Sequence, residues 1–166
     1  AGAVFNIEKL NWMNGEYIKN YDLYKLTELI IPYLNASGID TSDTAKTKRV
    51  VHAIRNYISK LDEAGEQAKV YYSHVNLTDE QKEIVNSDSS KLVFAVLAKK
   101  VKDLLEITDN NFKPLLSEVQ KETAIKGKNL FMPVRLALTG QEHGPELGLI
   151  AYVLGREEIL NRLSSI

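Results

Sequence analysis

The sequence has 166 residues, of which 44% are hydrophobic and 26% charged, a composition that excludes a disordered or fibrous protein. The net charge of −1 gives no overall positive field that would point to a nucleic acid, and the absence of cysteine excludes disulfides and thiolate metal sites. The longest apolar run, residues 92–98, is far shorter than the stretch of about 20 residues that spans a bilayer, so we expect a cytoplasmic protein without a membrane partner. The chain starts without methionine, which suggests a piece of a longer polypeptide.

The first half of the chain shows two amphipathic helical patterns. Behind a capping Asp22, apolar residues recur at helical spacing up to residue 34. A second apolar stripe runs through residues 47–61 and predicts one helix over this range, with Tyr57 in the core. The segment from Lys46 to Arg55 contains Lys46, Lys48, Arg49 and Arg55 with no acid between them, and Lys48 and Arg55 share one face of the predicted helix with His52 and Ser59. Either solvent or an anionic partner can cover such a face.

The second half continues in helices. Thr78 and Gln81 form a capping-box pattern for a short helix that ends near residue 85. Residues 91–107 predict a helix rather than a strand, because the apolar spacing continues for too long. Thr108 is the expected cap of the next helix, which ends before Gly127.

Glycine and proline mark the last helices. Pro133 suits the first turn of a helix that ends at Gly140, and Gly155 separates two short closing helices. With no strand pattern or fixed repeat, the predicted fold class is all-α, as two helical bundles in series. The polar stretch at residues 73–78 places the boundary between domains 1–76 and 77–166.

Patterns of catalytic residues are absent from the sequence. The histidines His52, His74 and His143 lack metal-site spacing, and no phosphate-binding glycine loop or nucleophile elbow occurs. One side chain does require an explanation, because Arg135 is the only charge in the apolar run 130–138. A buried, unpaired guanidinium is unfavourable by several kcal/mol, so its partner is either an internal carboxylate or a ligand.

Three segments together resemble the C-terminal half of bacterial-type glutamyl-tRNA synthetases, and the resemblance extends over essentially the whole chain. They are FNIEKLNWMNGEYIK near the start, LDEAGEQAKVYY in the middle and GKNLFMPVRLALTGQEHGPELG near the end. The family is one of class I aminoacyl-tRNA synthetases, whose catalytic half carries HIGH-like and KMSKS-like ATP motifs. Neither motif occurs in this sequence. The resemblance therefore implies that this piece has no catalytic residues and no cofactor, while ATP and Mg²⁺ serve the parent enzyme.

The resemblance also implies an architecture and a partner. A stem-contact helical segment is followed by two all-helical anticodon-binding subdomains, and the partner is the anticodon stem and loop of tRNA(Glu). We expect a monomer that binds no DNA. Trp12 and Met13 are expected to pack in the core where the stem-contact segment meets the bundle. A different interpretation is a helical protein–protein interaction module that does not bind RNA.

Four residues are implied to read anticodon bases. Arg135 corresponds to a base-reading arginine of the family, and the loop positions matching Gly144, Pro145 and Leu147 contact the first two anticodon bases. Gly144 allows close backbone approach, Pro145 holds the loop, and Leu147 offers an apolar surface for stacking. A salt bridge of Arg135 to a carboxylate remains the alternative.

Two positions depart from the family. Where relatives often carry an arginine that reads the third anticodon base, this sequence has Tyr57, and both Tyr57 and Arg55, two residues earlier, are expected to contact the anticodon, with Arg55 as the substitute reader. Another frequent arginine aligns with Ser117. Discrimination between glutamate and glutamine anticodons is therefore in doubt. The expected contacts with the RNA backbone come from Lys48, Arg49, Lys126 and Lys128.

Overall fold

The computed structural model describes residues 6–166, and these residues form helices and connecting segments without a β-strand. The all-α prediction is therefore confirmed. The chain divides into two compact units, one ending at Tyr72 and the other comprising Ser73–Ile166. The division lies in the polar region where the sequence placed a boundary, four residues before the end of the expected first domain at residue 76.

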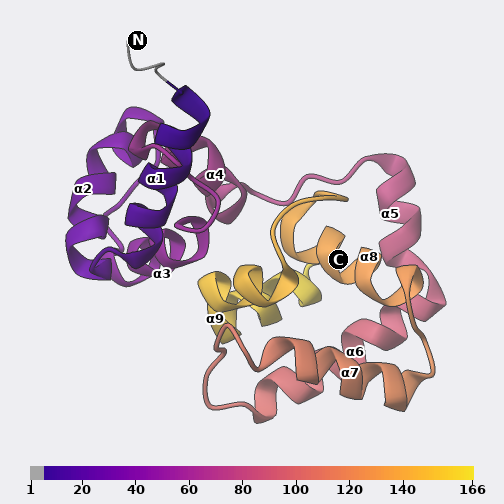
Figure 1. Cartoon of the computed structure of the whole chain (residues 1–166). Coiled ribbons are helices and arrows are strands. Elements are labelled where there is room, and N and C mark those ends of the chain that lie inside the picture. Colours follow the sequence, from indigo (N-terminus) through magenta and orange to yellow (C-terminus); the bar gives the residue numbers. More distant parts are fainter. Residues whose placement is uncertain (1–5) are drawn as a thin grey trace, which may run out of the picture. The chain divides into compact units, whose positions relative to one another are not determined.

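Unit 1 is built on three helices that pack against one another, α2, α3 and α4 (Figure 1). Its elements are α1 (Ile7–Asn20), α2 (Leu23–Ala36), α3 (Thr44–Ile54), the 3-10 helix η1 (Leu61–Glu63) and α4 (Ala64–Tyr72). The predicted cap is confirmed, because the Asp22 carboxylate accepts a hydrogen bond from the backbone N–H of Lys25 at 3.0 Å. Leu26, Ile30 and Leu34 of α2 are buried at the centre.

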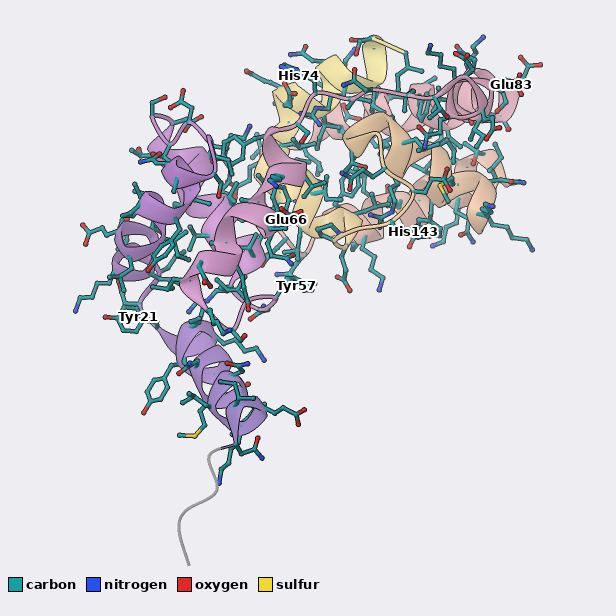
Figure 2. All side chains as sticks on the ribbon, turned by 90° about the horizontal axis from the view of Figure 1, so that it is seen from above. Tyr21, Tyr57, Glu66, His74, Glu83 and His143 are labelled. Carbon is teal, nitrogen blue, oxygen red and sulfur yellow. The ribbon has the colours of Figure 1, made fainter. Side chains whose placement is uncertain are left out.

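Helix α1 is attached to unit 1 through its C-terminal half. Ile18 is buried there, and Gly15 faces the backbone of Ile58 and Ser59. The N-terminal half of α1 projects beyond the other helices of the unit (Figure 2). The prediction that Trp12 and Met13 pack in the core is wrong, because both are exposed on this projecting part.

The prediction of one helix over residues 47–61 is also wrong in its second half. Helix α3 ends at Ile54, and the next helical turn starts only at Leu61. The Glu63 carboxylate accepts hydrogen bonds from the backbone N–H of Ser59 at 2.8 Å and from the Ser59 hydroxyl at 3.3 Å. These bonds start a new helical segment and so interrupt the stripe. Tyr57 lies in the connection and is half-exposed, so its predicted core position is wrong as well (Figure 2).

Unit 2 is arranged around α6, which packs against every other helix of the unit (Figure 1). The helices are α5 (Asp79–Asn86), α6 (Asp88–Asp103), α7 (Phe112–Thr123), α8 (Lys128–Thr139) and α9 (Leu147–Ser164). Helix α9 also packs against α7 and α8. The core of the unit takes buried apolar side chains from all five helices.

Two helix boundaries in unit 2 differ from the prediction. Helix α6 ends at Asp103, and Leu105, expected on its apolar stripe, is 96% exposed. Helix α7 starts at Phe112, so Thr108 is not its cap. The Asn111 side chain fixes the intervening loop, because its oxygen accepts from the N–H of Thr108 at 2.9 Å and its nitrogen donates to the Glu106 carbonyl at 3.0 Å.

Other signals in unit 2 are confirmed. Thr78 and Gln81 form the reciprocal capping box, with hydrogen bonds of 3.1 and 3.2 Å. Gly140 ends α8 with φ of 69°, and Gly155 interrupts α9 with φ of 77° and ψ of 168°. Pro133, however, is not in the first turn of its helix, because α8 already begins after Gly127, whose φ is 60°.

Candidate nucleic-acid interface

A groove of about 700 Å³ opens in unit 2 between α7, α8 and the first turn of α9. Helix α8 contributes Phe131 and Arg135, and α9 contributes Leu147 and Gly148 behind Glu146. The remaining lining residues come from α7 and the loop before it, and they are Asp109, Asn110, Lys113, Pro114, Leu116 and Ser117. The groove therefore contains Arg135, the lone charge of the apolar run. It also contains Ser117, one of the two positions at which the sequence departs from the family.

Arg135 is half-buried in the wall of this groove. Its Nη1 donates a hydrogen bond to the carbonyl oxygen of Pro145 at 2.8 Å, and no carboxylate of the described residues lies within 4.0 Å of its guanidinium. Burial lowers the pKa of Arg135, but an arginine remains protonated in proteins. Arg135 is therefore a cation held by a neutral carbonyl, not the internal salt bridge of the alternative interpretation.

The loop after α8 is shaped by its glycines and by Thr139. The Thr139 hydroxyl donates to the Arg135 carbonyl at 2.8 Å and accepts from the N–H of Gln141 at 3.1 Å. Gly144 has φ of 146°, a conformation that residues with a side chain rarely adopt. A Cβ at this position would lie 3.6 Å from the Arg135 Nη1, which is ordinary contact. The backbone conformation, rather than a lack of space, therefore requires glycine here.

Leu147 differs from its expected role as an exposed surface for stacking. It is the first residue of α9 and lines the groove, but only 8% of it is exposed. The loop before α7 packs closely over this turn, since a Cβ on Gly148 would lie 3.1 Å from the Asp109 carbonyl oxygen. Leu147 therefore offers little exposed apolar surface for stacking.

Phe131 is a residue that the sequence did not single out. It lies four residues before Arg135 on α8, so both side chains share one face of the helix, and it is 42% exposed. The sequence could have indicated it by this spacing. Pro133 as a first-turn residue predicts a later start of the helix, which leaves Phe131 outside it, whereas α8 begins at Lys128.

The predicted backbone contacts are dispersed. Lys126 and Lys128 flank Gly127 at the start of α8, where both are exposed and neither lines the groove. In unit 1, the Lys48 ammonium lies over the Tyr24 ring at 3.7 Å from its centroid, and Arg49 is half-buried. Such a cation–π pair keeps its charge available to an anion while limiting the mobility of the side chain.

Arg55, the predicted substitute reader, is already engaged inside unit 1. Its Nη2 donates to the carbonyl oxygens of Ile18 at 3.1 Å and Tyr21 at 2.6 Å, at the C-terminal end of α1. A cation is favoured at that end by the helix dipole. This geometry gives Arg55 a structural task, whereas Tyr57 beside it is half-exposed.

Among the described residues, no group of three or more histidine, aspartate or glutamate side chains is arranged to hold a metal ion. His74 and His143 are both exposed on the surface of unit 2 (Figure 2). No described helix has the length and apolar character that crossing a membrane requires.

Comparisons with known proteins agree on one class. A family model described as an anticodon binding domain matches residues 25–166. Glutamate–tRNA ligase 1 of Caldicellulosiruptor saccharolyticus is 39% identical over 168 residues, which are 97% of this chain and 35% of that ligase. The glutamate–tRNA ligase of Bacillus cereus is 36% identical over 170 residues, which are 99% of this chain and 35% of that ligase. This chain therefore spans about a third of the length of these relatives.

A solved structure shows the same fold. The crystal structure of a glutamate tRNA ligase from Elizabethkingia meningosepticum, in complex with its amino acid, is 18% identical in sequence to this chain. It superimposes with a TM-score of 0.74, over 99% of this chain and 33% of the other. At this identity the likeness supports the all-helical fold alone.

Proposed function

This chain belongs to the family of anticodon binding domains, and we propose that it binds the anticodon stem and loop of tRNA(Glu) as part of a glutamyl-tRNA synthetase. The named relatives are ligases of glutamate and tRNA. In the parent enzyme, the remaining two thirds carry out the reaction. There, ATP and Mg²⁺ activate glutamate as an adenylate, and the glutamate is transferred to the terminal adenosine of the tRNA. We place the protein in the cytoplasm as a monomer.

The observation that carries this proposal is the state of Arg135. A guanidinium has five N–H donors, and the Pro145 carbonyl takes one of them. The side chain lines an open groove, so its remaining donors can meet a ligand. Proteins recognise an RNA sequence mainly at unstacked loop bases, by stacking on the bases and by hydrogen bonds to their edges. Because Arg135 has no internal carboxylate as partner, its guanidinium suits recognition of an RNA base better than a purely structural role.

Several further features support the proposal. Gly144 and Pro145 shape the loop beside Arg135, and burial of Leu147 fixes the start of α9 under the groove. Outside the groove, Lys126 and Lys128 are exposed cations that can contact phosphates. In unit 1, taken by itself, Lys48, Arg49 and the half-exposed Tyr57 are further proposed contacts with the RNA, while Arg55 holds the end of α1 in place.

The test is a titration of the chain with three anticodon stem-loops, which carry the glutamate, the glutamine and an unrelated anticodon. We expect the glutamate stem-loop to bind more tightly than the unrelated one. Arg135→Ala should remove this preference, since one good bidentate contact to a base discriminates by about 1–3 kcal/mol. The matched control is Arg156→Ala, which removes the same charge from an exposed position of α9 outside the groove. Equal affinity for all three stem-loops would exclude base reading.

Comparison of the glutamate and glutamine stem-loops addresses the two departures from the family. Ser117 lines the groove but lacks the charge of an arginine, and Tyr57 cannot form a bidentate contact to a base. We therefore expect the two stem-loops to bind with similar affinity. A salt titration separates RNA binding from a protein-docking surface, because the logarithm of affinity for single strands falls with a slope of about −0.7 per neutralised phosphate. An apolar protein interface would respond little.

A further inference from the structure

Phe131 is an aromatic side chain that is exposed on the surface of unit 2. Within residues 73–166, the exposed large hydrophobic side chains are Ile84, Leu92, Leu105 and Phe131. Phe131 is the aromatic one among them, and it alone of the four lines the groove. Its ring therefore leaves apolar surface in water beside the Arg135 guanidinium. A flat ring next to a cation is the kind of surface on which nucleobases stack.

The opposite wall of the groove carries a second cation. Lys113 lies in the first turn of α7 and is exposed, and no described carboxylate lies within 4.0 Å of its ammonium. The two acids further along α7, Glu118 and Glu122, instead pair with Lys100 of α6 at 3.3 and 3.0 Å. Lys113 can therefore accept an anion from solution.

We propose that this groove holds one complete nucleotide of the anticodon loop, with its base stacked on Phe131 and its phosphate neutralised by Lys113. The proposal rests on the function proposed above and assigns two residues to it. Arg135, one helical turn from Phe131, then reaches the edge of the stacked base. The volume of about 700 Å³ lies within the usual range of small-ligand sites.

One carboxylate of the groove lining is consistent with this assignment. Glu146 immediately precedes the first turn of α9. The positive end of the helix dipole offsets negative charge at this position. Carboxylates also accept hydrogen bonds from the exocyclic amine of cytosine. Glu146 therefore suits a base edge, whereas a phosphate suits Lys113.

The experiment uses the glutamate anticodon stem-loop with 2-aminopurine substituted at each loop position in turn. Stacking on an aromatic ring is worth about 1–3 kcal/mol per base, so Phe131→Leu should weaken binding roughly 5- to 150-fold. It should also remove the change in 2-aminopurine fluorescence at one loop position, and Phe131→Tyr should retain both properties. Leu92→Ala is the matched control, because it removes exposed apolar surface from a position outside the groove.

Lys113 has an independent measurement. Lys113→Gln should reduce the magnitude of the salt slope by about 0.7, the value for one phosphate contact on a single strand. Lys121→Gln, on the same helix but outside the groove, should leave the slope unchanged. This measurement requires no change at Phe131, so it remains decisive if Phe131→Leu unfolds the protein.

The outcomes separate this inference from the proposed function. If the wild type binds no stem-loop, the proposed function is wrong. If the wild type binds and Arg135→Ala weakens binding, but Phe131→Leu and Lys113→Gln behave like the wild type, the nucleotide assignment alone is wrong. A fluorescence change of the wild-type complex that persists in Phe131→Leu would also overturn the stacking role.

Discussion

The guanidinium of Arg135 and the carbonyl oxygen of Pro145 are joined by a hydrogen bond of 2.8 Å, which ties α8 to the loop that precedes α9. The two residues are ten positions apart in the sequence. The bond holds the guanidinium against the loop without neutralising its charge. One hydrogen bond therefore positions both the loop and the guanidinium. Its loss should have a small effect on stability and a separate effect on RNA binding.

Arg135→Ala should lower the free energy of unfolding by about 1 kcal/mol, the usual net value of one hydrogen bond. The loss stays small because no buried carboxylate is left without a partner. Urea unfolding followed by circular dichroism measures the change, with Arg156→Ala as the exposed control. A loss of about 3–5 kcal/mol, as expected when a buried ion pair is broken, would contradict this arrangement.

Gly65→Ala should destabilise unit 1 by about 1–3 kcal/mol, the range for overpacking a core. Gly65 is the glycine of the LDEAGEQAK segment on α4, and a Cβ there would lie 2.7 Å from the Cβ of Ser37 at the end of α2. The double variant Gly65→Ala with Ser37→Gly removes the clashing atoms and should recover most of the loss. A double-mutant cycle in urea measures this coupling, and additive losses would show that the close approach is not the cause.

Four cap or breaker signals predicted helix ends correctly, whereas the cap expected at Thr108 and the helix start expected near Pro133 were wrong. Asp22, the Thr78–Gln81 box, Gly140 and Gly155 all act at the expected positions. Apolar periodicity alone failed at helix ends, because it does not register competing hydrogen bonds of polar side chains. Glu63 starts a new segment inside one stripe, and Asn111 fixes a loop where another stripe was expected to continue.

Prediction of the site was limited because its key contacts depend on the path of loops and on the exact ends of helices. Arg135 was recognisable as a lone charge in an apolar run, but its Pro145 partner required the path of the loop. Pro133 predicts a helix that starts after Phe131, but α8 already begins at Lys128, so the predicted helix does not indicate Phe131. Arg55 carries the right charge, yet its hydrogen bonds to α1 arise from residues more than 30 positions away, which sequence spacing cannot reveal.

Glu63→Ala should lower the stability of unit 1 by about 1 kcal/mol, since removing a side chain that caps a helix start costs about 0.5–2 kcal/mol. The variant leaves the backbone N–H of Ser59 without its acceptor. Amide hydrogen exchange of Ser59 and of the first turn of α4 should therefore quicken. Asp62→Ala is the matched control, because it removes an equal charge from the neighbouring position and Asp62 has no part in this cap. Equal effects of both variants would indicate that net charge, not capping, is responsible.

Tyr71→Phe should make unit 1 less sensitive to alkaline pH. Only 1% of Tyr71 is exposed, and its hydroxyl has no hydrogen-bond partner among the described residues. Burial raises the pKa of the phenol above its ordinary value of 10.0, and Tyr57 makes a smaller contribution in the same direction. Below pH 10 the tyrosine is protonated in both the folded and the unfolded chain. Above pH 10 the unfolded chain releases this proton while the folded chain retains it, so stability falls as pH rises.

The loss from this one group should reach about 1.4 kcal/mol at pH 11, since each pH unit beyond the unfolded pKa corresponds to about 1.36 kcal/mol. We expect Tyr71→Phe to match or exceed wild-type stability at pH 8, because it removes a buried hydroxyl without a partner. It should then exceed the wild type by a further ~1.4 kcal/mol at pH 11. Hydrogen exchange of α4 amides between pH 8 and pH 11, compared with urea unfolding, measures the difference. Tyr17→Phe, at an exposed position of α1, should follow the wild type, and a parallel decline of Tyr71→Phe and wild type would show that the Tyr71 phenol titrates normally.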